Sequence, residues 1–167
     1  MDDPGGSAVG LGDGGDGGGR RRRGDVRGPG GDHIGTGGND VIKGTSGADT
    51  IVAYGGNDDI WGFGGDDYVC AGPGWDRVWG GAGNDLLLGE GDPDELYGGR
   101  GNDTIWGGDD ADLIYGEGGL DQLLGEGGRD EIHGGLHDDD LWGGPQKDVL
   151  YGDKGDDVID GDDRRDK

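Results

Sequence analysis

The sequence predicts an all-β repeat fold, a solenoid of short stacked strands, flanked by a disordered arm and a short charged tail. Two observations predict it. Asp recurs at every ninth position from Asp40 to Asp157, fourteen times without interruption, and Ile, Val or Leu follows two positions after each of these Asp residues. A nine-residue unit is too short to bury a core by itself, so its copies must wind and stack on one another.

Residues 35–160 divide into fourteen gapless nonapeptides of the form G-x-x-G-x-D-x-U-x, where U is aliphatic. Gly at the first and fourth positions suits a turn that needs positive φ and close backbone approach. The pattern predicts a six-residue turn followed by a three-residue strand, with one inward aliphatic side chain per unit. These side chains are Ile42, Ile51, Ile60, Val69, Val78, Leu87, Leu96, Ile105, Ile114, Leu123, Ile132, Leu141, Leu150 and Ile159.

The flanks carry no such pattern. Residues 1–34 are rich in Gly, Asp and Arg without hydrophobic periodicity, which predicts a disordered arm. Its last part, the GPGGDHI fragment at 28–34, has the form of a slipped or decayed repeat, and residues 161–167 form the charged tail. The run Arg20–Arg23 is interpreted as a solvated charge run, with contact to a phosphate, to an acidic partner or to the acidic roll of its own chain as the alternatives.

The repeat resembles the RTX, or haemolysin-type, calcium-binding nonapeptide, whose consensus is G-G-x-G-x-D-x-U-x. The resemblance covers 126 of the 167 residues. It implies a right-handed parallel β-roll of about seven turns, with two nonapeptides per 18-residue turn and Ca²⁺ held between neighbouring turns.

The ninth position of the units supports an 18-residue turn, because alternate units differ there as two separate sheets would. One series is mostly aromatic and the other mixes aliphatic and aromatic residues. The first comprises Lys43, Trp61, Trp79, Tyr97, Tyr115, His133 and Tyr151, and the second Val52, Cys70, Leu88, Trp106, Leu124, Trp142 and Asp160.

The charge balance indicates that such a roll needs positive counter-ions. The chain has 38 acidic and 14 basic residues and a net charge of −24, and the repeat block alone holds 29 acidic and 6 basic residues. Asp side chains stacked one strand spacing apart, about 4.8 Å, repel by about 0.9 kcal/mol even in water. We therefore expect the chain to stay unfolded without counter-ions.

The RTX resemblance implies the ligands. Each Ca²⁺ would take the carbonyls of the second and fourth positions and the Asp of one unit, with first- and third-position carbonyls and the Asp of the unit 18 residues later. Six gaps in each of two stacks allow up to about twelve Ca²⁺ ions. The implied carboxylates are Asp40, Asp49, Asp58, Asp67, Asp76, Asp85, Asp94, Asp103, Asp112, Asp121, Asp130, Asp139, Asp148 and Asp157.

In the first turns the implied carbonyls form two sets. Those of Thr36 and Gly38 would face those of Ala53 and Gly55, and on the opposite edge those of Thr45 and Gly47 would face those of Gly62 and Gly64. Four units lack Gly at the fourth position, and we expect weaker sites around them. The residues there are Asp92, Asp110, His137 and Gln146.

No catalytic site is expected. The chain has two Ser, one Cys and three His. His133 and His137 share the spacing of a zinc-protease helix, but Gly-Gly-Leu separates them and the catalytic Glu is missing. Cys70 is interpreted as an outward apolar residue, with intermolecular pairing as the alternative.

The aromatic series predicts a strip of rings on one outer face, which either supports itself, docks a neighbouring domain or a second roll, or binds polysaccharide. Three functions stay open. The first is a non-enzymatic, extracellular calcium-binding structural module. The second is the detached repeat region of a larger secreted enzyme or toxin, and the third a surface or matrix protein that binds carbohydrate or self-associates.

Neither a nucleic-acid partner nor a membrane span is expected. The start MDDPGGSAVG lacks the features of a signal peptide, and only GDDRRDK follows the last unit. The RTX resemblance implies type I secretion to the cell surface or beyond. Members often carry a capping segment behind the repeats, and its absence here favours a fragment, a split reading frame or a minimal member.

Overall fold

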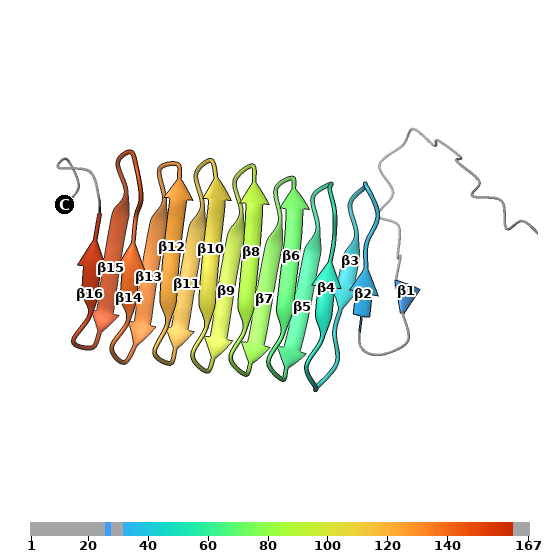
Figure 1. The fold of residues 1–167 in the computed structure, drawn as a ribbon, viewed down its shortest axis with the longest axis horizontal. Coiled ribbons are helices and arrows are strands. Elements are labelled where there is room, and N and C mark those ends of the chain that lie inside the picture. Colours follow the sequence, from blue (N-terminus) through green and yellow to red (C-terminus); the bar gives the residue numbers. More distant parts are fainter. Residues whose placement is uncertain (1–25, 28–31, 162–167) are drawn as a thin grey trace, which may run out of the picture.

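The fold is a flattened β-solenoid built from two facing parallel sheets (Figure 1). The computed structural model describes residues 26–27 and 32–161. Within this part of the chain every regular element is a strand, which confirms the predicted all-β roll. Most of the predicted arm, including Arg20–Arg23, and residues 162–167 of the predicted tail lie outside the described residues.

The two sheets take alternate strands. The nine strands of sheet 1 are β1 (Val26–Arg27), β2 (Asp32–Ile34), β4 (Thr50–Val52), β6 (Tyr68–Pro73), β8 (Leu86–Gly91), β10 (Thr104–Asp109), β12 (Gln122–Gly127), β14 (Asp140–Trp142) and β16 (Val158–Asp160). The seven strands of sheet 2 are β3 (Val41–Lys43), β5 (Asp59–Gly64), β7 (Arg77–Ala82), β9 (Glu95–Arg100), β11 (Leu113–Gly118), β13 (Glu131–Leu136) and β15 (Val149–Lys154).

Neighbouring strands pair in parallel with a shift of 18 residues, as in Ile60 with Val78. The predicted 18-residue turn is therefore confirmed. Only β1 departs from this arrangement among the described strands, because it pairs antiparallel with β2. The strand β2 in turn pairs in register with β4, His33 opposite Ile51. The decayed repeat thus keeps its strand, which lies just before the boundary at residue 35 that the repeat count predicts.

The predicted strand length is wrong for most units. Only the strands near the two ends span three residues, whereas β5 to β13 and β15 span six. Each long strand continues through the first three positions of the next nonapeptide, where Phe63, for example, pairs with Gly81. The turn proper is therefore limited to the three residues that end at each repeat Asp.

The core lies between the sheets and consists of the eighth-position side chains together with Ala53 and Ala71 at the first position. From Ile42 to Leu141 each of these is at most 2% exposed, whereas Ile159 in the last unit is 48% exposed. His33 continues the row at the amino-terminal end and is buried. Since one branched side chain per unit fills the narrow space between the sheets, the strict aliphatic pattern follows from packing.

Two positions of the unit use the left-handed region, the fourth in the turn and the second, which lies within the long strands. At the fourth position, Asp92, Asp110, His137 and Gln146 adopt φ values of 70°, 73°, 83° and 93°. Gly at the same position has positive φ in five units, at Gly56, Gly65, Gly74, Gly83 and Gly101. The prediction of positive φ at first-position Gly is wrong for the described residues, and the second position has it instead. Non-glycine residues there also have positive φ, at a cost of about 1–3 kcal/mol each. They are Tyr54, Phe63, Glu90, Glu117, Glu126 and Asp153.

Candidate metal sites between the turns

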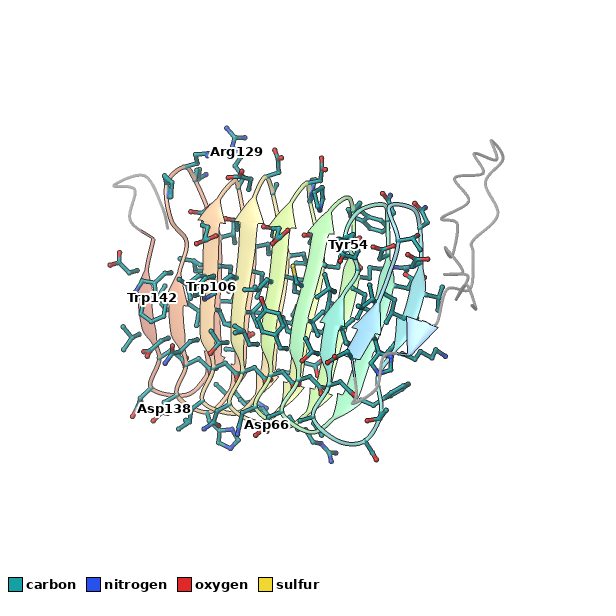
Figure 2. The ribbon with its side chains drawn as sticks, turned by 45° about the vertical axis from the view of Figure 1, so that its right-hand side comes forward. Tyr54, Asp66, Trp106, Arg129, Asp138 and Trp142 are labelled. Carbon is teal, nitrogen blue, oxygen red and sulfur yellow. The ribbon has the colours of Figure 1, made fainter. Side chains whose placement is uncertain are left out.

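The repeat Asp residues form two rows, one along each edge of the solenoid. The turns that carry Tyr54 and Arg129 lie at one edge, and those that carry Asp66 and Asp138 at the other (Figure 2). The first row comprises Asp40, Asp58, Asp76, Asp94, Asp112, Asp130 and Asp148, and the second Asp49, Asp67, Asp85, Asp103, Asp121, Asp139 and Asp157. All of them except Asp157 are at most 4% exposed. A buried carboxylate is strongly destabilising unless it is paired.

One oxygen of each interior carboxylate is paired with the backbone. Asp58 Oδ1 accepts a hydrogen bond of 2.6 Å from the N–H of Asp40, and Asp76 Oδ1 accepts one of 2.7 Å from the N–H of Asp58. The same bond recurs along both rows, as between Asp139 Oδ1 and the N–H of Asp121 at 2.9 Å. Each Asp therefore links its own turn to the previous one, which fixes the direction of the second oxygen.

The second carboxylate oxygen is buried and has no hydrogen-bond partner in ten of the units. A buried acceptor left unpaired costs about 1–3 kcal/mol, and more when it is charged. Ten such oxygens in two regular rows indicate positions that a cation would occupy. They are the Oδ2 atoms of Asp58, Asp67, Asp76, Asp85, Asp94, Asp103, Asp112, Asp121, Asp130 and Asp139.

The first turn differs from the rest. Asp40 Oδ2 accepts hydrogen bonds from the backbone N–H and the hydroxyl of Thr36, at 2.6 and 2.9 Å. Asp49 Oδ2 accepts the corresponding bonds from Thr45, at 2.6 and 3.0 Å. Thr occupies the second position only in these two units, so the first carboxylate of each row is partly satisfied by its own turn.

Backbone carbonyls border the same spaces as the unpaired oxygens. A Cβ added to Gly116 would lie 2.5 Å from Asp121 Oδ2 and 2.6 Å from the carbonyl oxygen of Gly134 in the next turn. First-position Gly thus keeps open a space that a carboxylate and a first-position carbonyl both face. A Cβ on Gly81 would collide with the carbonyl of Phe63, and one on Gly101 with that of Gly83. Second- and fourth-position carbonyls therefore also point toward the following turn.

The carbonyls that the resemblance implies in the first turns lie at these turn edges. The Ala53 carbonyl lies beside Gly35, and the Gly62 carbonyl beside Gly44. The carbonyl of Gly38 accepts a hydrogen bond from the Thr36 hydroxyl at 3.3 Å, and that of Gly47 one from the Thr45 hydroxyl at 3.2 Å. A cation would therefore compete with a hydroxyl for these two oxygens.

Burial raises the pKa of the row carboxyls well above the ordinary value of 3.8. The pKa of Asp94 rises to about 9, and those of Asp76, Asp103 and Asp112 to about 7. Neighbouring carboxylates raise these pKa values further, while the backbone N–H that each Oδ1 accepts lowers them. Without a cation, the fold thus disfavours the ionised form of its own Asp rows.

The donor set fits a hard cation. Within the described part of the chain, no three His, Cys, Asp or Glu side chains gather as a conventional metal cluster. The oxygens that face the gaps are carboxylates and carbonyls, and Ca²⁺ accepts six to eight such ligands in irregular shells. A Gly-rich turn can present carbonyls where side chains would obstruct them.

A family model of the RTX calcium-binding nonapeptide repeat matches the chain in overlapping segments at residues 34–69, 64–87, 71–105, 88–123, 117–150 and 133–166. The chain belongs to the RTX calcium-binding repeat family. No match was found among curated proteins. The RTX nonapeptide is a calcium-binding repeat, and its sixth-position Asp residues are the ones that form the two rows in this RTX chain.

A second ladder of hydrogen bonds between turns, beside the Asp rows, was not predicted from the sequence. At the fifth position, Asn84 Oδ1 accepts a hydrogen bond from the N–H of Asn102 at 2.8 Å, and Asn102 Oδ1 accepts one from Leu120 at 3.0 Å. The ladder is interrupted at Trp75, whose side chain has no oxygen acceptor, and at Pro93, 18 positions later, which has no N–H to donate. The recurrence of Asn or Asp at the fifth position was the signal available in the sequence.

The aromatic strip is a continuous stack on the outer face of sheet 2. Neighbouring ring centroids are 4.9 Å apart for Trp61 and Trp79, and 4.6 Å apart for His133 and Tyr151, with intermediate steps of 4.8 to 5.6 Å. The Lys43 ammonium lies 5.2 Å from the Trp61 ring centre at one end. The rings pack face to face, so interior ring faces are covered and only their edges meet solvent.

The histidine pair does not form a zinc site of the kind considered from the sequence. The His133 ring is part of the aromatic stack, and its Nε2 lies 3.1 Å from Glu131 Oε1. His137 lies in a turn with positive φ. Cys70 is half-buried on sheet 1, where its thiol donates a hydrogen bond to Glu90 at 3.2 Å.

One substitution pair tests whether the first-position space is needed. Gly89→Val should lower Ca²⁺ affinity and the midpoint temperature of unfolding, because its Cβ would lie 2.5 Å from Asp94 Oδ2 and would collide with the Gly107 carbonyl. Gly91→Val is the matched control in the same unit, since a Cβ there meets nothing within 4 Å. Calorimetry in Ca²⁺ with both variants is the measurement. Equal losses would mean that this space holds no ligand.

Proposed function

We propose that the chain is a calcium-binding structural module that folds when Ca²⁺ fills the gaps between its turns. The observation that supports this most is the two rows of buried Oδ2 atoms without hydrogen-bond partners, which occur at every interior unit from Asp58 to Asp139. In each gap the Asp residues of two successive turns would hold one ion together with the second-, fourth-, first- and third-position carbonyls. Bound Ca²⁺ would supply the positive charge that these carboxylates lack.

The ion count follows from the geometry of the rows. Seven Asp residues in each row enclose six gaps, so up to about twelve Ca²⁺ ions would bring +24 against a repeat block with 29 acidic and 6 basic residues. Near-neutral total charge would remove the repulsion between stacked turns. The units with Asp92, Asp110, His137 and Gln146 keep their turn conformation. We propose that their calcium sites are the weaker ones, because a side chain stands at the fourth position where Gly has only a hydrogen atom.

The extracellular space is the proposed place of action. Calcium-dependent extracellular modules are tuned to about 10⁻⁴–10⁻³ M Ca²⁺, well above the free concentration in a cytosol. A chain that folds only above that threshold would stay unfolded until it leaves the cell. Among the described residues there is no helix with the length and hydropathy needed to cross a membrane.

Equilibrium dialysis against Ca²⁺ and Mg²⁺ tests the proposed site chemistry. We expect close to twelve Ca²⁺ per chain at saturation and little Mg²⁺ binding at the same concentration. Mg²⁺ demands a tight octahedron and releases its water reluctantly, whereas the spaced carboxylates and carbonyls suit a larger ion. Two or fewer Ca²⁺ per chain, or equal uptake of Mg²⁺, would contradict the proposal.

A further inference from the structure

A groove lies on the outer face of sheet 1, over β10, β12 and β14. It has a volume of about 650 Å³ and is bordered by Asp109, Leu124, Glu126 and Trp142. Gly127, Gly144 and Pro145 complete its lining and add no charge.

The groove combines an apolar wall with two carboxylates. Leu124 and Trp142 are opposite each other in neighbouring strands, and Asp109 is opposite Gly127 at the strand ends. No basic residue borders the groove. Unlike the tryptophans of sheet 2, Trp142 stacks on no other ring among the described residues. A guanidinium group fits this combination, because it stacks on indole and pairs with carboxylates through its fork of donors.

We propose that this groove binds the Arg20–Arg23 segment of a second copy of the chain. These four residues are the densest positive charge in a chain of net charge −24. Charge complementarity therefore favours an occupant that every copy already carries. The groove presents side chains of units whose backbone carbonyls border the proposed calcium gaps, so this inference rests on the calcium-loaded fold of the proposed function.

The reach of the chain favours a second copy over the same molecule. Val26 is fixed to the first end of the roll by its pairing with Ile34 in β2. From β1, which carries Val26, there are five strand steps of about 4.8 Å to β10 and six to β12, or about 24 to 29 Å. The six residues from Arg20 to Val26 span about 20 Å when fully extended, so even the far end of the run falls short of the groove of its own roll.

Fluorescence anisotropy with a labelled peptide of residues 17–25 tests the groove directly. The Ca²⁺-loaded protein with Arg20–Arg23→Ser leaves the groove free, and the peptide should bind it saturably. In that background, Trp142→Ala should weaken peptide binding about tenfold or more, as should Asp109→Asn with Glu126→Gln, since buried aromatic and charged contacts dominate such sites. A peptide with Lys in place of Arg should bind less tightly.

A matched control separates the groove from the general negative charge of the roll. Glu95→Gln with Glu131→Gln also removes two negative charges, but from the outer face of sheet 2, and should leave peptide binding unchanged. Equal weakening in this control, or no change in Trp142→Ala, would overturn the proposal. Circular dichroism in Ca²⁺ verifies that each variant keeps the fold of its parent.

Sedimentation velocity of the unmodified full chain in Ca²⁺ then tests the second copy. We expect concentration-dependent association that weakens with salt and is lost in Arg20–Arg23→Ser. Arg164→Ser with Arg165→Ser, which removes Arg residues elsewhere, should associate as the parent does. A parent that stays monomeric at all concentrations, or association that is unchanged without the arginine run, would overturn the proposal.

Discussion

Asp58→Ala should destabilise the calcium-loaded roll by about 3–5 kcal/mol at fixed Ca²⁺, the cost of leaving buried charges without their partner. Asp58 is 1% exposed, accepts the N–H of Asp40 and holds an unpaired Oδ2. If it bridges two ions, its loss weakens two sites at once. Asp148→Ala, beside the units with His137 and Gln146, should cost less. Urea unfolding at constant Ca²⁺ is the measurement.

The Ca²⁺ midpoint is a less sensitive measure of the same change. When about twelve ions bind with folding, a loss of 4 kcal/mol shifts the midpoint only by about twofold, because the free energy is shared among all of them. Asp58→Asn is the control that keeps an acceptor for the Asp40 N–H and removes only the charge. Equal stability losses for Asp58→Ala and Asp148→Ala would mean that the imperfect units bind as well as the others.

Acidification to about pH 4 should unfold the calcium-loaded roll. A carboxylate that ligates Ca²⁺ must be ionised, so its pKa in the bound state lies below the unfolded value of 3.8. The resulting stability is fully present well above 3.8 and is lost as the pH falls past that value toward the bound-state pKa, and many ligating carboxylates contribute to this loss together. Circular dichroism across pH 7 to 3 in excess Ca²⁺ is the measurement. A β-rich spectrum retained at pH 3 would contradict carboxylate ligation.

In the ion-free roll the Asp carboxyls affect stability in the opposite direction. Its Asp94 has a pKa raised to about 9, and those of Asp76, Asp103 and Asp112 rise to about 7. These carboxyls therefore destabilise the empty fold at neutral pH, an effect that disappears below the unfolded pKa of 3.8. If the empty chain is unfolded, its Asp residues are already ionised at pH 6.5, and Ca²⁺ should release almost no protons. A preformed empty roll would release several.

The sequence predicted the solenoid because one signal repeats through the whole chain. The Asp and aliphatic positions recur every nine residues, and two faces of different composition distinguish 18-residue turns. The paired registers of Ile60 with Val78 and Trp61 with Trp79 follow directly from that spacing. The position of the Asp rows was predictable for the same reason, since identical residues 18 apart must stack.

The features that the sequence missed depend on contacts between turns. The six-residue strands require pairing such as Phe63 with Gly81, which no single unit reveals. Phe63 has a φ of 75°, which its residue type did not predict, because aromatic residues rarely adopt positive φ. His33 was not recognised as a core residue since its turn lacks the repeat Asp. The face-to-face stacking of the rings also follows from backbone spacing rather than from residue type.

The central claim, that Ca²⁺ drives the folding of this roll, is tested most directly by circular dichroism. The chain is first held in excess chelator and then titrated with Ca²⁺ at neutral pH and constant ionic strength. We expect a disordered spectrum in chelator and a cooperative gain of β signal on adding Ca²⁺, without an equivalent gain on adding Mg²⁺. A β-rich spectrum that persists in chelator would contradict it.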